Sequence, residues 1–239
     1  VGFVARPLGG LIFGHFGDKI GRKTMLVITL MLMGGATVAI GLLPTYEQIG
    51  ILAPILLLLL RIAQGIGIGG EWGGAVLMAY EFAPNGKRGF YASIPQIGLS
   101  LGLFLSSGVM ALLTMLPDDQ FMAWGWRSAF IGSIVLVVLG TWIRSNIGES
   151  PEFEKAKAES RSRDVGLPFV TMIKRYPGNV VLGMGARYID GVFFNVFAVF
   201  SILYLSKIVG IPRTQALWTV CGAALVMVLF IPFFGRLSD

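Results

Sequence analysis

Five ionisable side chains lie inside long apolar segments of the sequence: Arg6, Arg61, Glu71, Arg187 and Asp190. An ionisable group at membrane depth costs roughly 2.5–3.5 kcal/mol on insertion scales, so each is a candidate functional residue. A guanidinium binds a carboxylate through two parallel hydrogen bonds, and the three arginines therefore favour an anionic substrate. The two carboxylates are candidate proton carriers, since a nearby arginine can hold a carboxylate ionised until substrate displaces that partner.

The spacing of polar residues in the apolar segment 52–80 predicts one polar helix face. Arg61, Gln64, Ile68 and Glu71 follow i, i+3, i+7, i+10 spacing. At about 100° per residue they fall within an arc of about 80°. We expect this face to line a cavity rather than to contact lipid.

Two of the five charges have alternative interpretations. Arg187 and Asp190 stand at i, i+3 on the segment 179–205, with Asn195 further along, and the two charges could simply pair with each other. Arg6 could extend its guanidinium to the membrane interface instead of facing a pathway.

The composition indicates that these residues are carried by membrane-spanning helices. The chain is 55% hydrophobic and 13% charged, with a mean hydropathy of +0.76, whereas soluble domains carry about 25% charged residues. A spanning helix needs about 20 apolar residues, and backbone polar groups in lipid must be satisfied within a helix or a closed barrel. We expect helices at 1–14, 24–43, 52–80, 91–114, 128–146, 179–205 and 215–234.

The basic residues orient the chain in the membrane. Thirteen Lys and Arg residues lie in connectors on one side, against three on the other. The first side, made of 15–23, 81–90, 144–178 and 235–239, is therefore cytoplasmic. The net charge of +6 comes from these basic connectors. The sequence shows no basic face with interleaved aromatic residues, the pattern that would indicate nucleic-acid binding. A single cysteine, Cys221, allows no intrachain disulfide and no cysteine-based metal cluster.

A short pattern occurs twice, each time after an apolar segment on the cytoplasmic side. Gly14 and Asp18 are separated by three residues, as are Gly235 and Asp239. Two repeated helical halves, with a substrate site between them near mid-membrane, are a recurring plan of secondary transporters.

Several motifs resemble those of the major facilitator superfamily. "GHFGDKIGRKTML" resembles its signature loop between the second and third helices, and "RIAQGIGIGG" its fourth-helix motif. "FVARPLGG", "GGEWGGA", "WGWRSAF" and "ESPEFE" narrow the resemblance to the metabolite:proton symporter group, which includes shikimate, α-ketoglutarate, citrate and proline or betaine permeases. The resemblance to this group covers essentially the whole chain.

The resemblance implies an all-α membrane protein, a partial helical bundle with about seven transmembrane helices of an expected twelve, the second to the eighth. The implied organisation is an N-terminal helical half at 1–147, a cytoplasmic central linker at 148–178 and the start of a C-terminal half at 179–239. It also implies a multi-pass protein of the bacterial plasma or inner membrane, and we expect a monomer. Because only part of the bundle is present, the isolated chain is not expected to transport.

The implied function is proton-coupled symport of a small organic acid by alternating access, without a cofactor or metal. The residues expected to bind substrate are Arg6, Arg61, Gln64, Arg187 and Asn195. Glu71 and Asp190 are expected to couple proton movement. The signature loop is expected to latch the two halves in the outward-facing state, through Gly14, Asp18, Gly21, Arg22, Lys23 and, in the second copy, Asp239. The alternative is that the positive charges of this loop only orient the chain in the membrane and that the loop has no role in conformational switching.

Other functions fit the sequence less well. The chain lacks the motif HExxH and the Walker loop, so an enzyme is not expected. A symporter of a zwitterionic osmolyte such as proline or betaine would share the fold. A transporter-derived sensor and a channel are the alternatives of other classes, and repeated halves with buried ionisable pairs favour alternating access over a channel.

Overall fold

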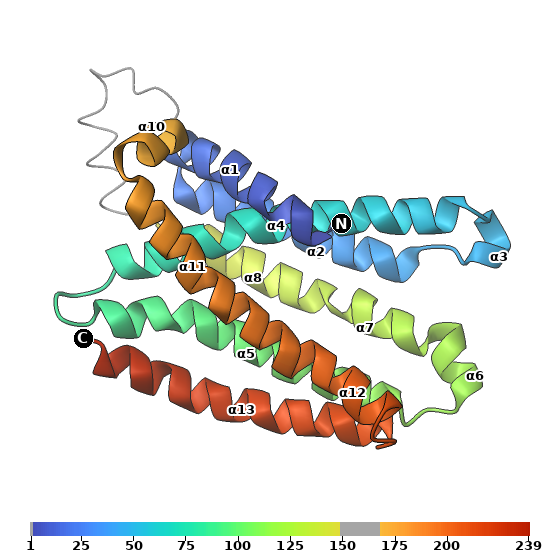
Figure 1. Ribbon diagram of the computed structural model, residues 1–239. Helices are drawn as coiled ribbons and strands as arrows, with labels where there is room; N and C mark the ends of the chain where they lie inside the picture. Colours follow the sequence, from blue (N-terminus) through green and yellow to red (C-terminus); the bar gives the residue numbers. More distant parts are fainter. Residues whose placement is uncertain (1, 149–167) are drawn as a thin grey trace.

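The computed structural model describes residues 2–148 and 168–239, without the side chains of Phe3, Asp18, Lys19, Asp190, Ala198 and residues 168–171. The described part is helical throughout and contains no strand (Figure 1). Six of its helices or continuous helical stretches are long and apolar enough to cross a membrane. They are α2 (Arg22–Leu42), α4 (Leu52–Glu81), α5 (Arg88–Leu113), the stretches Asp118–Asn146 and Pro177–Lys207, and α13 (Arg213–Leu237).

Two of these spans contain a local change of helix type. The first comprises α6 (Asp118–Gln120), the π-helix η1 (Phe121–Gly125), α7 (Trp126–Gly132) and α8 (Ile134–Asn146). The second comprises α11 (Pro177–Phe194), the π-helix η3 (Asn195–Phe200) and α12 (Ser201–Lys207). The short helices α3 (Tyr46–Ile49) and α10 (Pro168–Arg175) lie in connectors. With α1 (Gly2–Ile20) as a seventh long helix, the expected all-α bundle is confirmed.

The signature segment is helical rather than a loop. Helix α1 continues through Asp18 to Ile20, and only Gly21 separates it from α2. The backbone of Gly21 has φ 116°, a conformation that favours glycine. The prediction that the apolar helix ends near Gly14 and leaves Asp18 in a loop is therefore wrong. Where a helix extends beyond the lipid core, water can solvate its charged side chains, so their polarity does not end the helix.

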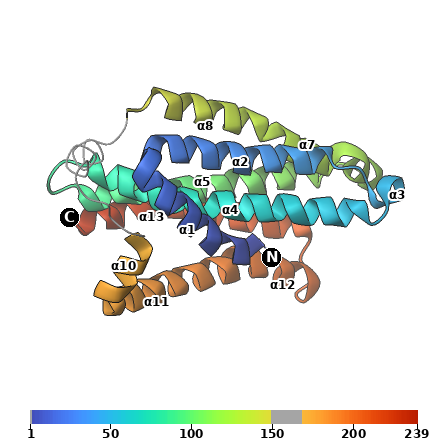
Figure 2. The same cartoon turned by 90° about the horizontal axis from the view of Figure 1, so that it is seen from above.

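The first four long helices pack closely through α4. Helices α1 and α2 both lie against α4, and α2 also contacts α7 and α8 (Figure 2). Gly65 and Gly69 of α4 face the backbone of α1, where an added methyl group would overlap the carbonyl oxygens of Gly2 and Arg6. Small residues allow such close helix contact inside a membrane.

Glycines four residues apart, at 65, 69 and 73 on α4 and at 98 and 102 on α5, have the GxxxG spacing of close helix contacts, but not all of them pack in this way. A methyl group on Gly73, Gly98 or Gly102 would meet no described atom within 4 Å. Gly73, Gly98 and Gly102 therefore make no close helix contact with the described residues. A GxxxG spacing gives the face of a helix, but it does not show which part of that face meets a neighbour.

Substitution of these glycines gives a direct test of the α1–α4 contact. Gly69→Ala should destabilise the chain by about 1–3 kcal/mol, because the added methyl group forces two backbones apart. Gly73→Ala, in open space on the same helix, should be neutral or stabilising by up to about 1 kcal/mol through helix propensity. Thermal unfolding in detergent, followed by circular dichroism at 222 nm, distinguishes the two; equal effects would contradict this packing.

Helices α5 and α13 lie side by side along most of their lengths (Figures 1 and 2). Small side chains are buried on both, including Ser107 and Ala111 on α5 and Ala216 and Ala224 on α13. Cys221 is buried in the same contact, with its Sγ 3.6 Å from the carbonyl oxygen of Phe104. This long contact joins segments that are more than 100 residues apart in sequence.

Candidate functional site

A cavity of about 400 Å³ lies between α1 and α4 and collects three of the predicted substrate-binding residues. Arg6, Arg61 and Gln64 line it, and its apolar walls are Gly2, Leu58, Gly65 and Ile68. The i, i+3 spacing on α4 places Arg61 and Gln64 on the side that faces α1. The spacing argument thus predicted this part of the site.

A chain of hydrogen bonds links Arg61 to α2. Arg61 Nη1 donates to Gln64 Oε1 at 3.2 Å, and Gln64 Nε2 donates to Thr37 Oγ1 at 2.6 Å. The Thr37 hydroxyl in turn donates to the carbonyl oxygen of Met33 at 2.8 Å. Thr37 was not among the residues predicted for the site, because the sequence around it gives no sign that its side chain faces Gln64.

Arg187 lies beside this cavity. Its guanidinium stands over the ring of Trp72 at 4.3 Å from the centroid, which joins α11 to α4. It is also near enough to Arg6 for the two positive charges to repel each other. Three guanidinium groups therefore gather where α1, α4 and α11 meet, a suitable environment for an anion.

Two further polar candidates, Asn195 and Asp190, lie on the same span as Arg187, Pro177–Lys207. Asn195 donates from Nδ2 to the carbonyl oxygen of Gly191 at 2.7 Å, within its own span, and it does not line the described cavity. Asp190 lies on α11, and the predicted pairing of its carboxylate with Arg187 falls outside the described side chains.

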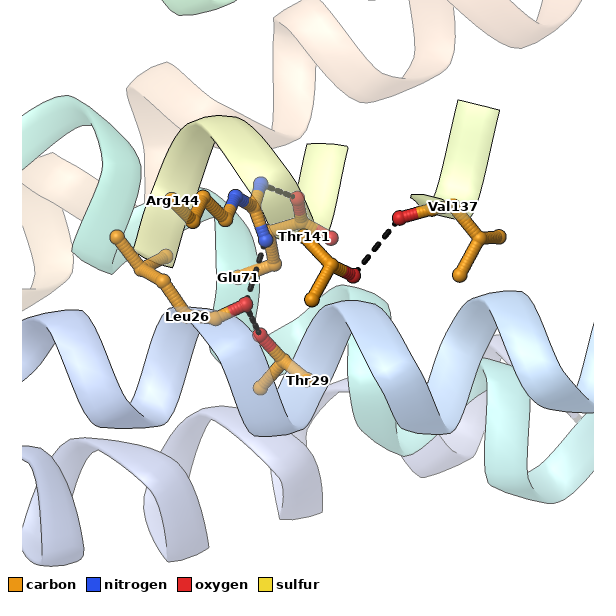
Figure 3. Close-up of polar contacts among 6 residues, drawn as sticks. All are labelled: Leu26, Thr29, Glu71, Val137, Thr141 and Arg144. Atoms are coloured by element: carbon orange, nitrogen blue, oxygen red, sulfur yellow. Dashed lines mark hydrogen bonds and ion pairs between the residues drawn. The ribbon is translucent and has the colours of Figure 1, made fainter. Parts of the chain in front are cut away.

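Glu71 does not line the cavity either. It forms an ion pair with Arg144 of α8, and both side chains are about one-fifth exposed. Arg144 Nη1 also donates to the carbonyl oxygen of Leu26 at 2.5 Å, and Thr29 Oγ1 donates to the same oxygen at 3.2 Å (Figure 3). The cluster joins α2, α4 and α8 through charged and polar groups.

The prediction that the whole polar face of α4 looks into one cavity is therefore wrong at Glu71. Ten residues separate it from Arg61, a rise of about 15 Å along a helix. At that level its ion-pair partner is Arg144, which extends from α8. Arg144 was missed as a candidate because it lies near the end of an apolar segment, where a basic residue is also expected on topological grounds.

Residues of the signature segment and of its second copy join helix ends on one side of the bundle. Arg22 forms an ion pair with Glu81 at the end of α4, and Lys23 Nζ donates to the carbonyl oxygen of Ser145 at 2.8 Å. Asp239 accepts hydrogen bonds from the backbone N–H groups of Gly89 at 2.5 Å and Phe90 at 3.0 Å. A carboxylate at this position caps α5 and interacts favourably with the helix dipole.

The remaining candidates of the signature segment are Gly14, Asp18 and Gly21. Gly21 supplies the break between α1 and α2, while Gly14 lies on an exposed helix face with no described atom near an added methyl group. The Asp18 side chain lies outside the described ones.

Comparison with known families identifies this arrangement. The family described as "Sugar (and other) transporter" matches residues 1–165, more than half of the chain. The chain belongs to this transporter family. It lies within the major facilitator superfamily and is a multi-pass membrane protein. Its relatives and its fold are those of transporters rather than enzymes.

Several relatives of this transporter chain match over its entire length. It is 44% identical to the inner membrane metabolite transport protein YhjE and 42% identical to the shikimate transporter, both of Escherichia coli K12, and covers 55% of each. A putative proline/betaine transporter of Staphylococcus haemolyticus is 39% identical, and the chain covers 51% of it. The chain thus spans about half the length of these relatives.

The fold of the transporter chain is also found among solved structures. The proton:xylose symporter XylE bound to 6-bromo-6-deoxy-D-glucose superimposes with a TM-score of 0.69, at 18% identity, over 96% of this chain and 56% of that one. This similarity places the helices in the major facilitator fold.

Proposed function

We propose that this chain is part of a secondary active transporter of the bacterial plasma membrane that carries a small organic acid together with protons. The observation that carries the proposal is the cavity between α1 and α4, where Arg6, Arg61 and Gln64 meet. The 42% identity to a shikimate transporter over the whole chain supports the same substrate class.

The charges around the cavity favour a carboxylate. None of its seven described lining residues is acidic, two are arginines, and Arg187 adds a third positive charge beside Arg6. An organic acid would gain bidentate hydrogen bonds from the guanidinium groups. A zwitterion such as proline or betaine, the substrate class named for one relative, would bring a cationic group into the same positive field.

Two carboxylates are proposed to couple the proton. Protonating Glu71 would remove the ion pair that joins α4 to α8 and would release Arg144. A proton would then change the contacts of three helices, as a coupled transport cycle requires. Asp190, on the same helix as Arg187, is the second proposed carrier. Asn195, nearby on that span, remains proposed as a substrate ligand.

The two-half organisation is proposed on the basis of the α5–α13 contact. We assign residues 1–147 to the N-terminal half, 148–178 to the linker and 179–239 to the start of the C-terminal half, in a monomer. The cap that Asp239 provides for α5 would then be a contact between halves that opens and closes during transport. Its counterpart in the first copy is proposed for Gly14, Asp18, Gly21, Arg22 and Lys23.

The substrate class is tested by uptake into proteoliposomes made with the full open reading frame that carries this sequence. Labelled shikimate, α-ketoglutarate and citrate are compared with labelled proline and betaine at equal concentrations. We expect saturable uptake of one or more acids and none of the zwitterions. Uptake of proline or betaine alone would contradict the anion argument, and binding without uptake would indicate a sensor.

A further inference from the structure

We propose that Thr37 is a positioning residue of the anion site, acting through Gln64 to hold the Arg61 guanidinium at the cavity. The inference rests on the proposed function and adds a residue of α2, a helix that contributes no side chain to the cavity lining. Its basis is the direction of each hydrogen bond in the chain Arg61–Gln64–Thr37–Met33.

The single hydroxyl hydrogen of Thr37 determines how the Gln64 amide is oriented. A threonine hydroxyl has one hydrogen to donate and two lone pairs that accept. The hydrogen is used on the Met33 carbonyl oxygen, 2.8 Å away, so Thr37 can only accept from Gln64. Gln64 must therefore turn its NH₂ group toward Thr37 and its carbonyl oxygen toward Arg61, in agreement with the observed bonds.

The opposite orientation of the amide would be unfavourable at both ends. A guanidinium has only donors, so an NH₂ group facing Arg61 could form no hydrogen bond with it. Gln64 is only 9% exposed, so the amide has little access to water that could replace a lost partner. An unsatisfied buried polar group costs about 1–3 kcal/mol, which makes the orientation of this amide well defined.

Removing the hydroxyl should weaken substrate binding without removing any ligand of the substrate. Thr37→Val keeps the shape of the side chain but accepts no hydrogen bond, so the KM for the transported acid should rise about three- to tenfold while kcat changes less than twofold. Thr37→Ser keeps the hydroxyl and should restore the KM to within about twofold of wild type. The matched control is Thr219→Val, because exposed Thr219 also donates to the carbonyl four residues earlier but contacts no other side chain among the described hydrogen bonds.

A double-variant cycle separates positioning from packing. If Thr37 acts through Gln64, then T37V/Q64A has the same KM as Q64A alone, because the amide is already absent. The assay is initial-rate uptake of the labelled acid by proteoliposomes, with protein content measured for every variant. If T37V and Q64A raise the KM additively, or if T37V leaves the KM unchanged, the inference about Thr37 is overturned. The proposed function still holds in that case, provided that the wild type takes up the acid. Absence of acid uptake by the wild type would overturn both.

Discussion

Replacing Arg144 by alanine should lower the free energy of unfolding of the chain by about 1–3 kcal/mol, the cost of leaving a partly buried polar group without its hydrogen-bond partner. Arg144 and Glu71 are 22% and 19% exposed and face each other between α8 and α4. Without Arg144, the Glu71 carboxylate would lie unpaired within the bundle. The Leu26 carbonyl oxygen would also lose its bond from Nη1, so α2 would be less firmly attached to α8.

Two further variants show whether this loss comes from the pair. Replacing both residues, Glu71→Met with Arg144→Met, should recover most of the stability, because an apolar pair of similar size often substitutes for a buried ion pair at no net cost. Arg236→Ala removes an exposed arginine and should have an effect below about 0.5 kcal/mol. The measurement is denaturant unfolding in detergent. A loss in Arg144→Ala no larger than that in Arg236→Ala would show that the pair contributes little to stability.

Arg61→Ala should reduce kcat/KM for acid uptake by about thirtyfold to several thousandfold. Truncating one partner of a desolvated charge pair costs about 2–5 kcal/mol, and each 1.36 kcal/mol is a factor of ten in rate. The Arg61 guanidinium lines the cavity and is held in place there by a neighbouring side chain, Gln64. Its loss removes both a positive charge and a preorganised pair of donors.

Arg61→Lys tests the geometry of that charge separately from its sign. Lysine keeps the positive charge but cannot form the planar bidentate contact, so we expect an intermediate loss of about tenfold. Uptake of the same labelled acid is measured in both variants, with Arg236→Ala as the control for a lost surface charge. Undiminished uptake in Arg61→Ala would remove this arginine from the substrate site.

The sequence predicted those features that depend on one helix at a time. Apolar segments of about twenty residues located the spans, and the i, i+3 spacing of Arg61 and Gln64 placed both in one cavity. These features follow from local geometry and from the cost of polar groups in lipid.

Features that depend on which helices are neighbours could not be predicted in this way. Glu71 has the same helical spacing as Arg61 and Gln64, but its partner is Arg144 of α8, a helix that the sequence of α4 does not identify. Thr37 of α2 accepts a hydrogen bond from Gln64. Nothing in the sequence around Thr37 distinguishes it from Thr29, whose hydroxyl donates to a backbone carbonyl of the same helix. Side-chain partners between helices are set by the three-dimensional packing, which single-helix periodicity does not contain.

The central claim, proton-coupled symport of an organic acid, is tested most directly by uptake of the labelled acid with and without an inward proton gradient. Proteoliposomes containing the protein from the full open reading frame are diluted into acidic buffer, with or without an uncoupler. The account predicts accumulation of the acid that collapses with the uncoupler and is absent in Arg61→Ala. Uptake of equal rate and extent in the presence and absence of the gradient would contradict symport and would indicate a uniporter or exchanger.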